Sequence, residues 1–354
     1  MRIAAVAPAF PSWRYTQSEI CSKLEQIWSE HRGTVSRLPA LLENTRVNAR
    51  HLSRPLEEYA SPSTFGENND VWIATAMDLG ERAIGDALTG LGLTPRDVDA
   101  IFAVSVTGVC SPSLDARLAN RMGFRSDIKR VPIFGLGCVA GVAGISRAVD
   151  YVKAYPDAVA VLLSVELCSL TFQPGDRSVA NLISAGLFGD GAAAVVVLGE
   201  ERARRMGARG LRVLDTRSVF YPDTEDLMGW TVSERGFEIV LSPEVPRLAE
   251  ERLGPDVDAF LASKGLTRAD VANWVCHPGG PKVLDAVGRS LGLDDDDLRH
   301  AWGSLAEHGN LSSTSVLMVL AATLAEAPAE AGGRALLLAM GPAFCSEVVL
   351  AEWC

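Results

Sequence analysis

Short apolar runs alternate along the chain with longer stretches in which apolar residues recur at helical spacing. In the first half, strands are expected at residues 2–7, 99–107, 131–134, 158–166 and 192–198, and helices at 71–90, 114–122 and 139–153. In the second half, strands are expected at 211–219, 238–241, 274–277, 335–340 and 348–352, and helices at 243–264, 282–291 and 313–327. Nearly continuous apolar strands between helices indicate sheets that are covered on both faces.

The two halves carry similar patterns, so we expect an α/β protein built from two related units, residues 1–205 and 206–354. The charged stretch at 199–210 is typical of a solvated connection between them. A seam between two such units is a common place for a pocket.

Charge, cysteine content and apolar run length argue against several classes of function. A net charge of −11 leaves no basic surface of the kind that nucleic acid requires. The seven cysteines form no CxxC pair, which argues against a zinc site or a disulfide framework and favours a reducing, cytoplasmic location. The four consecutive acids at 294–297 lack the spacing of a calcium loop, so no metal is expected. The longest apolar runs are far below the ~20 residues that span a bilayer.

Cys138 stands where an apolar stretch ends in glycines and a helical pattern of small residues begins. Unpaired backbone N–H groups and the positive end of the helix dipole favour thiolate over thiol at such a position. We therefore expect Cys138 to be a nucleophile that is held ionised. The alternative is a small buried cysteine that packs like alanine.

His277 and Asn310 complete a chemically coherent set with Cys138. His277 is expected at the end of a strand before a Gly/Pro loop, where α/β sheets present catalytic groups, although a structural histidine is the alternative. Asn310 stands in a polar turn ahead of an apolar helix, where a helix N-cap is the alternative. Together they suit acyl transfer: a cysteine nucleophile, a histidine partner, and N–H donors for an oxyanion. No carboxylate is adjacent in these motifs, and one would oppose an enolate by repulsion.

Residues 134–141, 275–285 and 307–315 resemble type III polyketide synthases, the chalcone synthase-like branch of the thiolase superfamily. The likeness covers nearly the whole chain and keeps the order Cys138, His277, Asn310. It implies a five-layered αβαβα fold and a homodimer. It also implies an acyltransferase that condenses malonyl-CoA iteratively onto an acyl-CoA starter and then cyclises the product, with CoA thioesters as substrates and no cofactor.

The same resemblance implies roles for further residues. Phe188 and Phe237 would guard the mouth of the reaction cavity, with plain core packing as the alternative. The cavity itself would be shaped by Thr171, Cys168, Gly229, Ser312, Gly341 and Pro342. Arg46 and Arg50 would meet the CoA phosphates, unless they serve only solubility.

The loop at 339–345 replaces two glycines and a phenylalanine of the plant enzymes by Ala339, Ala343 and Met340. It looks more like bacterial members that make alkylpyrones or alkylresorcinols from fatty acyl-CoA. One alternative is a ketoacyl synthase III-like enzyme of fatty-acid initiation, whose histidine segment differs from the His-Pro-Gly-Gly-Pro found here from His277 onward. The other is a non-catalytic partner subunit of a related synthase.

Overall fold

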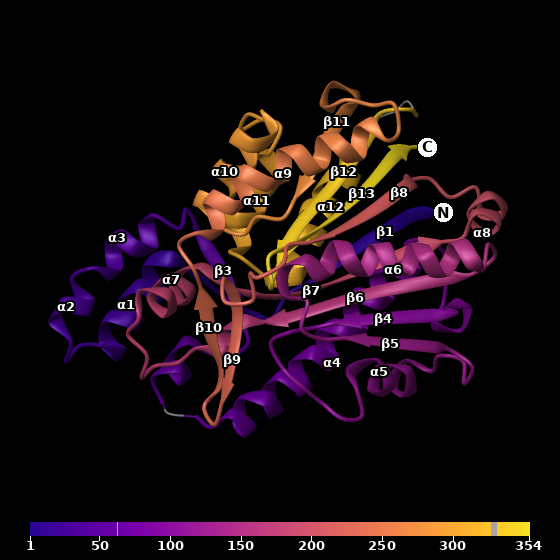
Figure 1. The fold of residues 1–354 in the computed structure, drawn as a ribbon. Coiled ribbons are helices and arrows are strands. Elements are labelled where there is room, and N and C mark those ends of the chain that lie inside the picture. The colour runs from indigo at the N-terminus through magenta and orange to yellow at the C-terminus, as the bar shows by residue number, and fades with distance from the viewer. Residues whose placement is uncertain (62, 327–330) are drawn as a thin grey trace.

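The computed structural model describes residues 1–61, 63–326 and 331–354, and Figure 1 shows its elements. The strands are β1 (Arg2–Ala9), β2 (Trp13–Thr16), β3 (Ala49–Leu52), β4 (Ala100–Val104), β5 (Lys129–Ile133), β6 (Val159–Leu167), β7 (Asp190–Leu198), β8 (Leu211–Phe220), β9 (Met228–Ser233), β10 (Gly236–Leu241), β11 (Val271–Cys276), β12 (Arg334–Gly341) and β13 (Cys345–Trp353). The helices are α1 (Gln17–Ile27), α2 (Arg32–Val35), α3 (Leu38–Glu43), α4 (Phe65–Thr89), α5 (Leu114–Met122), α6 (Ala140–Ala154), α7 (Val179–Leu187), α8 (Glu200–Met206), α9 (Val245–Ala262), α10 (Pro281–Leu291), α11 (Arg299–His308) and α12 (Ser315–Ala325). Short 3-10 turns used below are η1 (Leu56–Ala60), η3 (Gly137–Val139), η4 (Cys168–Thr171) and η6 (Ser312–Thr314).

The main sheet has two parts that correspond to the two halves of the chain. Its first part runs β1-β7-β6-β4-β5, and its second part runs β8-β13-β12-β11. Among the described strands, the two parts are joined where β1 pairs with β8, through Arg2 with Arg212 and Ile3 with Leu211. Each half of the chain therefore builds its own sheet.

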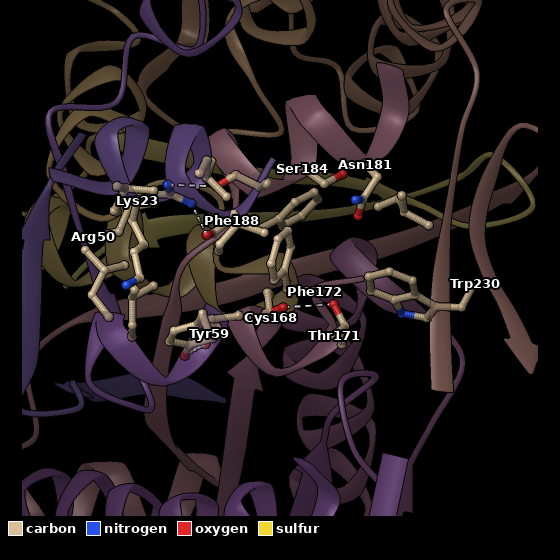
Figure 2. A pocket seen from close by; sticks show the side chains of 18 residues that line it. Lys23, Arg50, Tyr59, Cys168, Thr171, Phe172, Asn181, Ser184, Phe188 and Trp230 are labelled. Atoms are coloured by element: carbon tan, nitrogen blue, oxygen red, sulfur yellow. Dashed lines mark hydrogen bonds between the residues drawn. The ribbon is translucent and has the colours of Figure 1, made fainter. Parts of the chain in front are cut away.

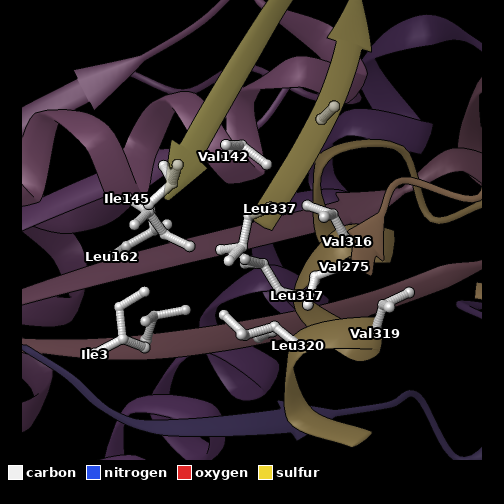
Figure 3. Close-up of a cluster of buried hydrophobic side chains, with 14 of the residues drawn as sticks. Ile3, Val142, Ile145, Leu162, Val275, Val316, Leu317, Val319, Leu320 and Leu337 are labelled. Atoms are coloured by element: carbon white, nitrogen blue, oxygen red, sulfur yellow. The ribbon is translucent and has the colours of Figure 1, made fainter. Parts of the chain in front are cut away.

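Helices α6 and α12 form a layer between the two sheets. Their side chains share one buried cluster with residues from both sheets, part of which Figure 3 shows. Small residues on α6 make this close packing feasible. At Gly144, for example, a Cβ would lie 2.5 Å from Leu162 Cδ1 of β6. The apolar runs of β6 and β7 are buried along their whole length, as expected for strands that are covered on both faces.

The outer faces of the two sheets are covered by other helices. Apolar residues of α4 and α5 pack with the first sheet in a second buried cluster, and those of α9 and α10 pack with the second sheet in a third. The resulting order of layers is α4/α5, sheet, α6/α12, sheet, α9/α10 (Figure 1). The predicted αβαβα fold is confirmed.

Several segments lie beside these layers, and of them the apolar pattern predicted only the strand at 238–241. They are α1 to α3, the β2–β3 pair, α7 and the β9–β10 hairpin, grouped on the left of Figure 1. The strand expected at 238–241 belongs to this hairpin and not to the second sheet. The connection expected at 199–210 contains α8, which buries Ala203. The expected helix end at 327 lies outside the described residues.

The proposed division into residues 1–205 and 206–354 stays a prediction. Within the described part of the chain, no helix is long and apolar enough to cross a lipid bilayer.

Candidate active site

Cys138 lies in η3, on a sharp elbow between β5 and α6. Gly135 and Gly137 adopt positive φ values of 92° and 56°, which residues with a Cβ rarely do. At Gly137 a Cβ would also lie 2.6 Å from Pro342 Cδ. The glycines that precede Cys138 thus allow the turn and the close approach of the loop at 342. The thiol donates to Ser312 Oγ over 3.7 Å.

His277 directly follows β11, at the carboxyl end of that strand. Its backbone N–H donates to the carbonyl of Leu338 on the neighbouring strand, over 2.9 Å. The side chain is only 4% exposed. Neither ring nitrogen has a hydrogen-bond partner among the described residues. A buried imidazole with two unused nitrogens fits a group that serves a substrate better than it fits a structural histidine.

Asn310 follows α11 through Gly309, whose φ is +69°. Its Nδ2 donates to the carbonyl of Gly279 over 3.0 Å, and its Oδ1 accepts from the backbone of Ser312 over 2.8 Å. The amide therefore links its own turn to the loop that follows His277. It does not cap α12, because that helix begins at Ser315.

All three residues line one cavity at the seam between the two halves, although they come from distant parts of the chain. The cavity contains about 710 Å³ of unoccupied space, part of it open to solvent. Four of the predicted cavity residues also line it: Phe188, Gly229, Ser312 and Pro342. The remaining walls are mostly apolar and include Leu187, Met228, Leu241, Val245 and Met340.

Burial sets the protonation states in this cavity. It raises the pKa of the Cys138 thiol to about 12; the Ser312 hydroxyl lowers this pKa and the charge of Glu166 raises it. Burial also lowers the pKa of His277 to about 4. Burial thus opposes both a thiolate at Cys138 and an imidazolium at His277, and the expectation that Cys138 is held ionised stays a prediction. Cys138 stands two residues ahead of α6 and is partly exposed, so the positive end of the helix dipole acts against the cost of burying its charge.

A buried carboxylate from outside the three motifs acts on Cys138. Glu166 on β6 has no exposed surface and accepts hydrogen bonds from Ser105, Thr107, Ser313 and the backbone of Val106. Burial raises its pKa to about 7, against the effect of these donors. A lone glutamate in the apolar run at 159–167 was the sequence signal that we did not use.

Comparison with known proteins identifies the family. The model for the N-terminal domain of chalcone and stilbene synthases matches residues 2–201, and the model for their C-terminal domain matches residues 213–352. The chain is a type III polyketide synthase. It is 48% identical to the 1,3,6,8-tetrahydroxynaphthalene synthase of Streptomyces peucetius subsp. caesius, over 99% of this chain and 93% of that protein.

More distant relatives agree with this assignment. The enzyme is 30% identical to the phloroglucinol synthase of Pseudomonas fluorescens, with 97% of each chain covered. It superposes on the crystal structure of 1,3,6,8-tetrahydroxynaphthalene synthase from Streptomyces coelicolor A3(2), a bacterial type III polyketide synthase, with a TM-score of 0.94. That alignment has 34% identity and covers 100% of this chain and 99% of the other. The polyketide assignment thus prevails over ketoacyl synthase III.

Two of the residues predicted to shape the cavity of this synthase lie away from it. Phe237 packs edge-on against Phe65 and beside Phe134, and is only 4% exposed. The cavity wall on its strand is formed further on, by Ile239, Val240 and Leu241. Gly341 lies behind Cys138, where a Cβ would be 2.6 Å from the carbonyl of Leu136. Phe237 and Gly341 thus pack against other parts of the protein. The spacing of residues in the sequence did not show which residues of these strands line the cavity.

A second chamber adjoins the catalytic cavity, and Figure 2 shows its lining. Three residues line both spaces: Phe188, Trp230 and Ile239. Thr171 and Cys168, which were predicted to shape the reaction cavity, line this second chamber instead. Thr171 donates to the carbonyl of Cys168 over 2.8 Å, and the two belong to η4. Trp230 and Ile239 were missed because the sequence pattern predicted a strand at 238–241 without showing that it pairs with β9 in a hairpin beside the cavity.

The two arginines predicted to bind CoA are placed very differently. Arg46 is exposed and stacks its guanidinium over the ring of Trp302, 4.7 Å from the ring centre. Its contact with CoA stays a prediction. Arg50 is 1% exposed and donates to the carbonyls of Phe188, over 2.5 Å, and Ala185, over 2.9 Å. Arg50 therefore positions the segment that carries Phe188, and this placement argues against a contact with CoA phosphates.

Proposed function

We propose that this synthase condenses malonyl-CoA units on Cys138 and closes the resulting chain into a hydroxylated aromatic product. The observation that carries the proposal is the convergence of Cys138, His277 and Asn310 on one largely apolar cavity. The printed names of the relatives support the product class, because tetrahydroxynaphthalene and phloroglucinol are hydroxylated aromatics without an alkyl chain.

In the first step, Cys138 Sγ attacks the carbonyl carbon of an acyl-CoA. The thiol proton passes to the neutral imidazole of His277, and the departing CoA sulfur takes that proton. The transient oxyanion accepts hydrogen bonds from the N–H groups of His277 and Asn310. A neutral imidazole is the form that can accept the proton, and the low pKa of His277 keeps it in that form.

In the second step, malonyl-CoA loses CO2 and becomes an enolate, whose oxygen the same two donors stabilise. The enolate carbon attacks the acyl-cysteine, and Cys138 leaves as a sulfur anion that is ready for the next transfer. Repetition lengthens the chain until it cyclises. These steps need no bound cofactor or metal.

A fatty acyl-CoA starter with an alkylpyrone or alkylresorcinol product is the second candidate. The apolar walls of the catalytic cavity, such as Met228, Leu241 and Val245, favour it. A hydrocarbon chain would bury well against them.

The experiment supplies the enzyme with malonyl-CoA alone and identifies products by mass spectrometry. A hydroxylated aromatic that is absent with Cys138→Ala is the expected result. No product from malonyl-CoA alone, but an alkylated product after addition of octanoyl-CoA or longer esters, would favour the second candidate. Product formation by the Cys138→Ala variant would refute both.

We also propose that the enzyme is a homodimer that associates along the free edge of β5. That strand ends the main sheet, and among the described strands its one partner is β4. Its Val131 is 37% exposed and the following Phe134 is 56% exposed, so an apolar strip borders the unpaired edge. Light scattering should give twice the monomer mass, and Val131→Lys should shift it toward the monomer. A monomeric wild-type enzyme at micromolar concentration would contradict this.

A further inference from the structure

Three rings from separate segments form a cluster next to Asn310. Phe10 directly follows β1, His51 lies on β3, and His308 is the last residue of α11. The Phe10 ring stacks on both histidines, with its centre 4.8 Å from that of His51 and 4.6 Å from that of His308. None of the three residues lines the catalytic cavity, so any effect that they have on the reaction must pass through a residue that does.

The His308 ring serves this cluster as a flat, uncharged surface. Its Nδ1 is buried and has no hydrogen-bond partner among the described residues. Burial lowers the pKa of His308 to about 4, and the charges of His51 and Arg14 act in the same direction, against that of Glu307. Arg14 and Glu307 pair with each other over 2.8 Å at the surface. The ring is therefore neutral at neutral pH, and the face that it offers to Phe10 is the contact that the cluster uses.

Gly309 alone separates His308 from Asn310 along the chain, and it is tightly enclosed. A Cβ at Gly309 would lie 2.4 Å from the carbonyl oxygen of Leu187 and 2.8 Å from Arg50 Cδ. Such close packing transmits a displacement and does not absorb it. A shift of His308 would therefore also shift Asn310.

The side chain of Asn310 must keep one direction to serve the cavity. Its Nδ2 donates to the carbonyl of Gly279, and its Oδ1 accepts from the backbone of Ser312. A carboxamide nitrogen carries two hydrogens, so the second can serve a substrate oxygen. Backbone hydrogen bonds with Leu187 and Gly189 hold Asn310 to the end of α7. The ring cluster holds the same turn to β1 and β3, so the two contacts together fix its position.

We propose that Phe10 and His308 are positioning residues for Asn310. Stacking of the two rings fixes the end of α11 against the first half of the chain, and this sets where the second carboxamide hydrogen meets the substrate oxygen. The proposal rests on the proposed function, because it assumes that Asn310 stabilises that oxygen. It goes beyond that function by assigning the geometry of the donor to rings outside the cavity.

A double-mutant cycle in the full-length enzyme tests the proposal. His308→Leu removes the flat ring, and Asn310→Ala removes the group that the ring positions. The readout is radioactive CO2 released from malonyl-CoA that is labelled in its free carboxyl group, and thermal melting reports the stability of each variant. With Asn310 present, we expect His308→Leu to lower kcat about tenfold or more, because a misplacement of about 1 Å reduces catalysis about 10²-fold. In the Asn310→Ala background, the same substitution should change kcat by less than about threefold.

Conservative and control variants accompany the cycle. His308→Phe keeps a flat, uncharged ring and should keep kcat within about threefold of the wild-type value. Phe10→Leu should act like His308→Leu, because it removes the other ring of the stack. Phe124→Leu removes a ring from the second buried cluster, beside α5, and should lower the melting temperature without lowering kcat.

Three outcomes would overturn the proposal: an unchanged kcat in the His308→Leu variant, an equal loss from His308→Leu in both backgrounds, or an equal loss from His308→Phe. If the His308→Leu variant does not fold, the same cycle with Phe10→Leu gives the decision. An unchanged kcat in the Asn310→Ala variant itself would instead refute the proposed function.

Discussion

Gly141→Ala tests how precisely the two halves must be joined at the reaction centre. Gly141 stands in the first turn of α6, and a Cβ there would lie 2.6 Å from Val316 Cγ1 and closer still to the carbonyl oxygen of Ser313. Carbon atoms normally approach other heavy atoms no closer than about 3.5 Å, so α6 and η6 must separate by about 1 Å. Such overpacking costs about 1–3 kcal/mol, and the better helix propensity of alanine offsets about 1 kcal/mol of it.

The same displacement moves η6, which holds Ser312 beside Cys138, away from the nucleophile. A misplacement of about 1 Å reduces catalysis about 10²-fold, so we expect kcat to fall by that factor while the protein stays folded.

Gly144→Ala is the matched control. It makes the same substitution one turn later in α6, but its Cβ meets the flexible end of Leu162 and no catalytic segment. We expect its kcat to stay within about threefold of the wild-type value. Release of CoA from malonyl-CoA gives kcat, and thermal melting gives stability for each variant. Equal kcat values for the Gly141→Ala variant and the wild-type enzyme, or equal losses in both variants, would refute the reasoning.

Three further predictions concern buried groups. The pKa of Glu166 is raised to about 7 in the folded enzyme, so stability that is fully present below pH 4.5 is lost as pH rises through 7. The free energy of unfolding of the Glu166→Gln variant, relative to that of the wild type, should therefore rise by about 3 kcal/mol between pH 4.5 and pH 8, as measured by denaturant unfolding. A difference between the two proteins that does not change with pH would contradict this. Alkylation of Cys138 by iodoacetamide should accelerate about tenfold per pH unit from pH 6 to 9, because its thiol pKa is about 12, whereas a plateau below pH 8 would indicate an ion pair. Arg50→Met should lower the melting temperature and leave KM for malonyl-CoA within about threefold, and a tenfold rise in KM at unchanged stability would restore a phosphate-binding role.

Much of the fold could be predicted from the sequence because its layers depend on long, regular apolar patterns. The span of α5 was predicted without error, and β7 and α10 within two residues. Each of the three residues predicted to react stands at the end of a strand or helix beside glycines, where local sequence is informative, and the structure brings them to one cavity. No single segment shows that Cys138 of the first half meets His277 and Asn310 of the second half. That meeting follows from the way the two halves pack against each other.

The residues that were misjudged depend on contacts between distant segments. The sequence around Arg50 suggests a surface cation. In the structure its guanidinium is buried and donates to carbonyls at the C-terminal end of α7. Phe237 and Ile239 lie on the same face of one strand, and only the position of the hairpin decides which of them meets the cavity. The protonation of Cys138 also depends on the desolvation of its sulfur, which a helix-terminus argument does not include.

The central claim is that acyl groups are transferred to one sulfur, that of Cys138. Peptide mass mapping after a brief incubation with an acyl-CoA, followed by acid quenching, tests it most directly. We predict a single acylated peptide that contains Cys138, lost in the Cys138→Ala variant and slowed in the His277→Ala variant. An acyl group on Cys168 or on another cysteine, or none on the wild-type enzyme, would contradict the account.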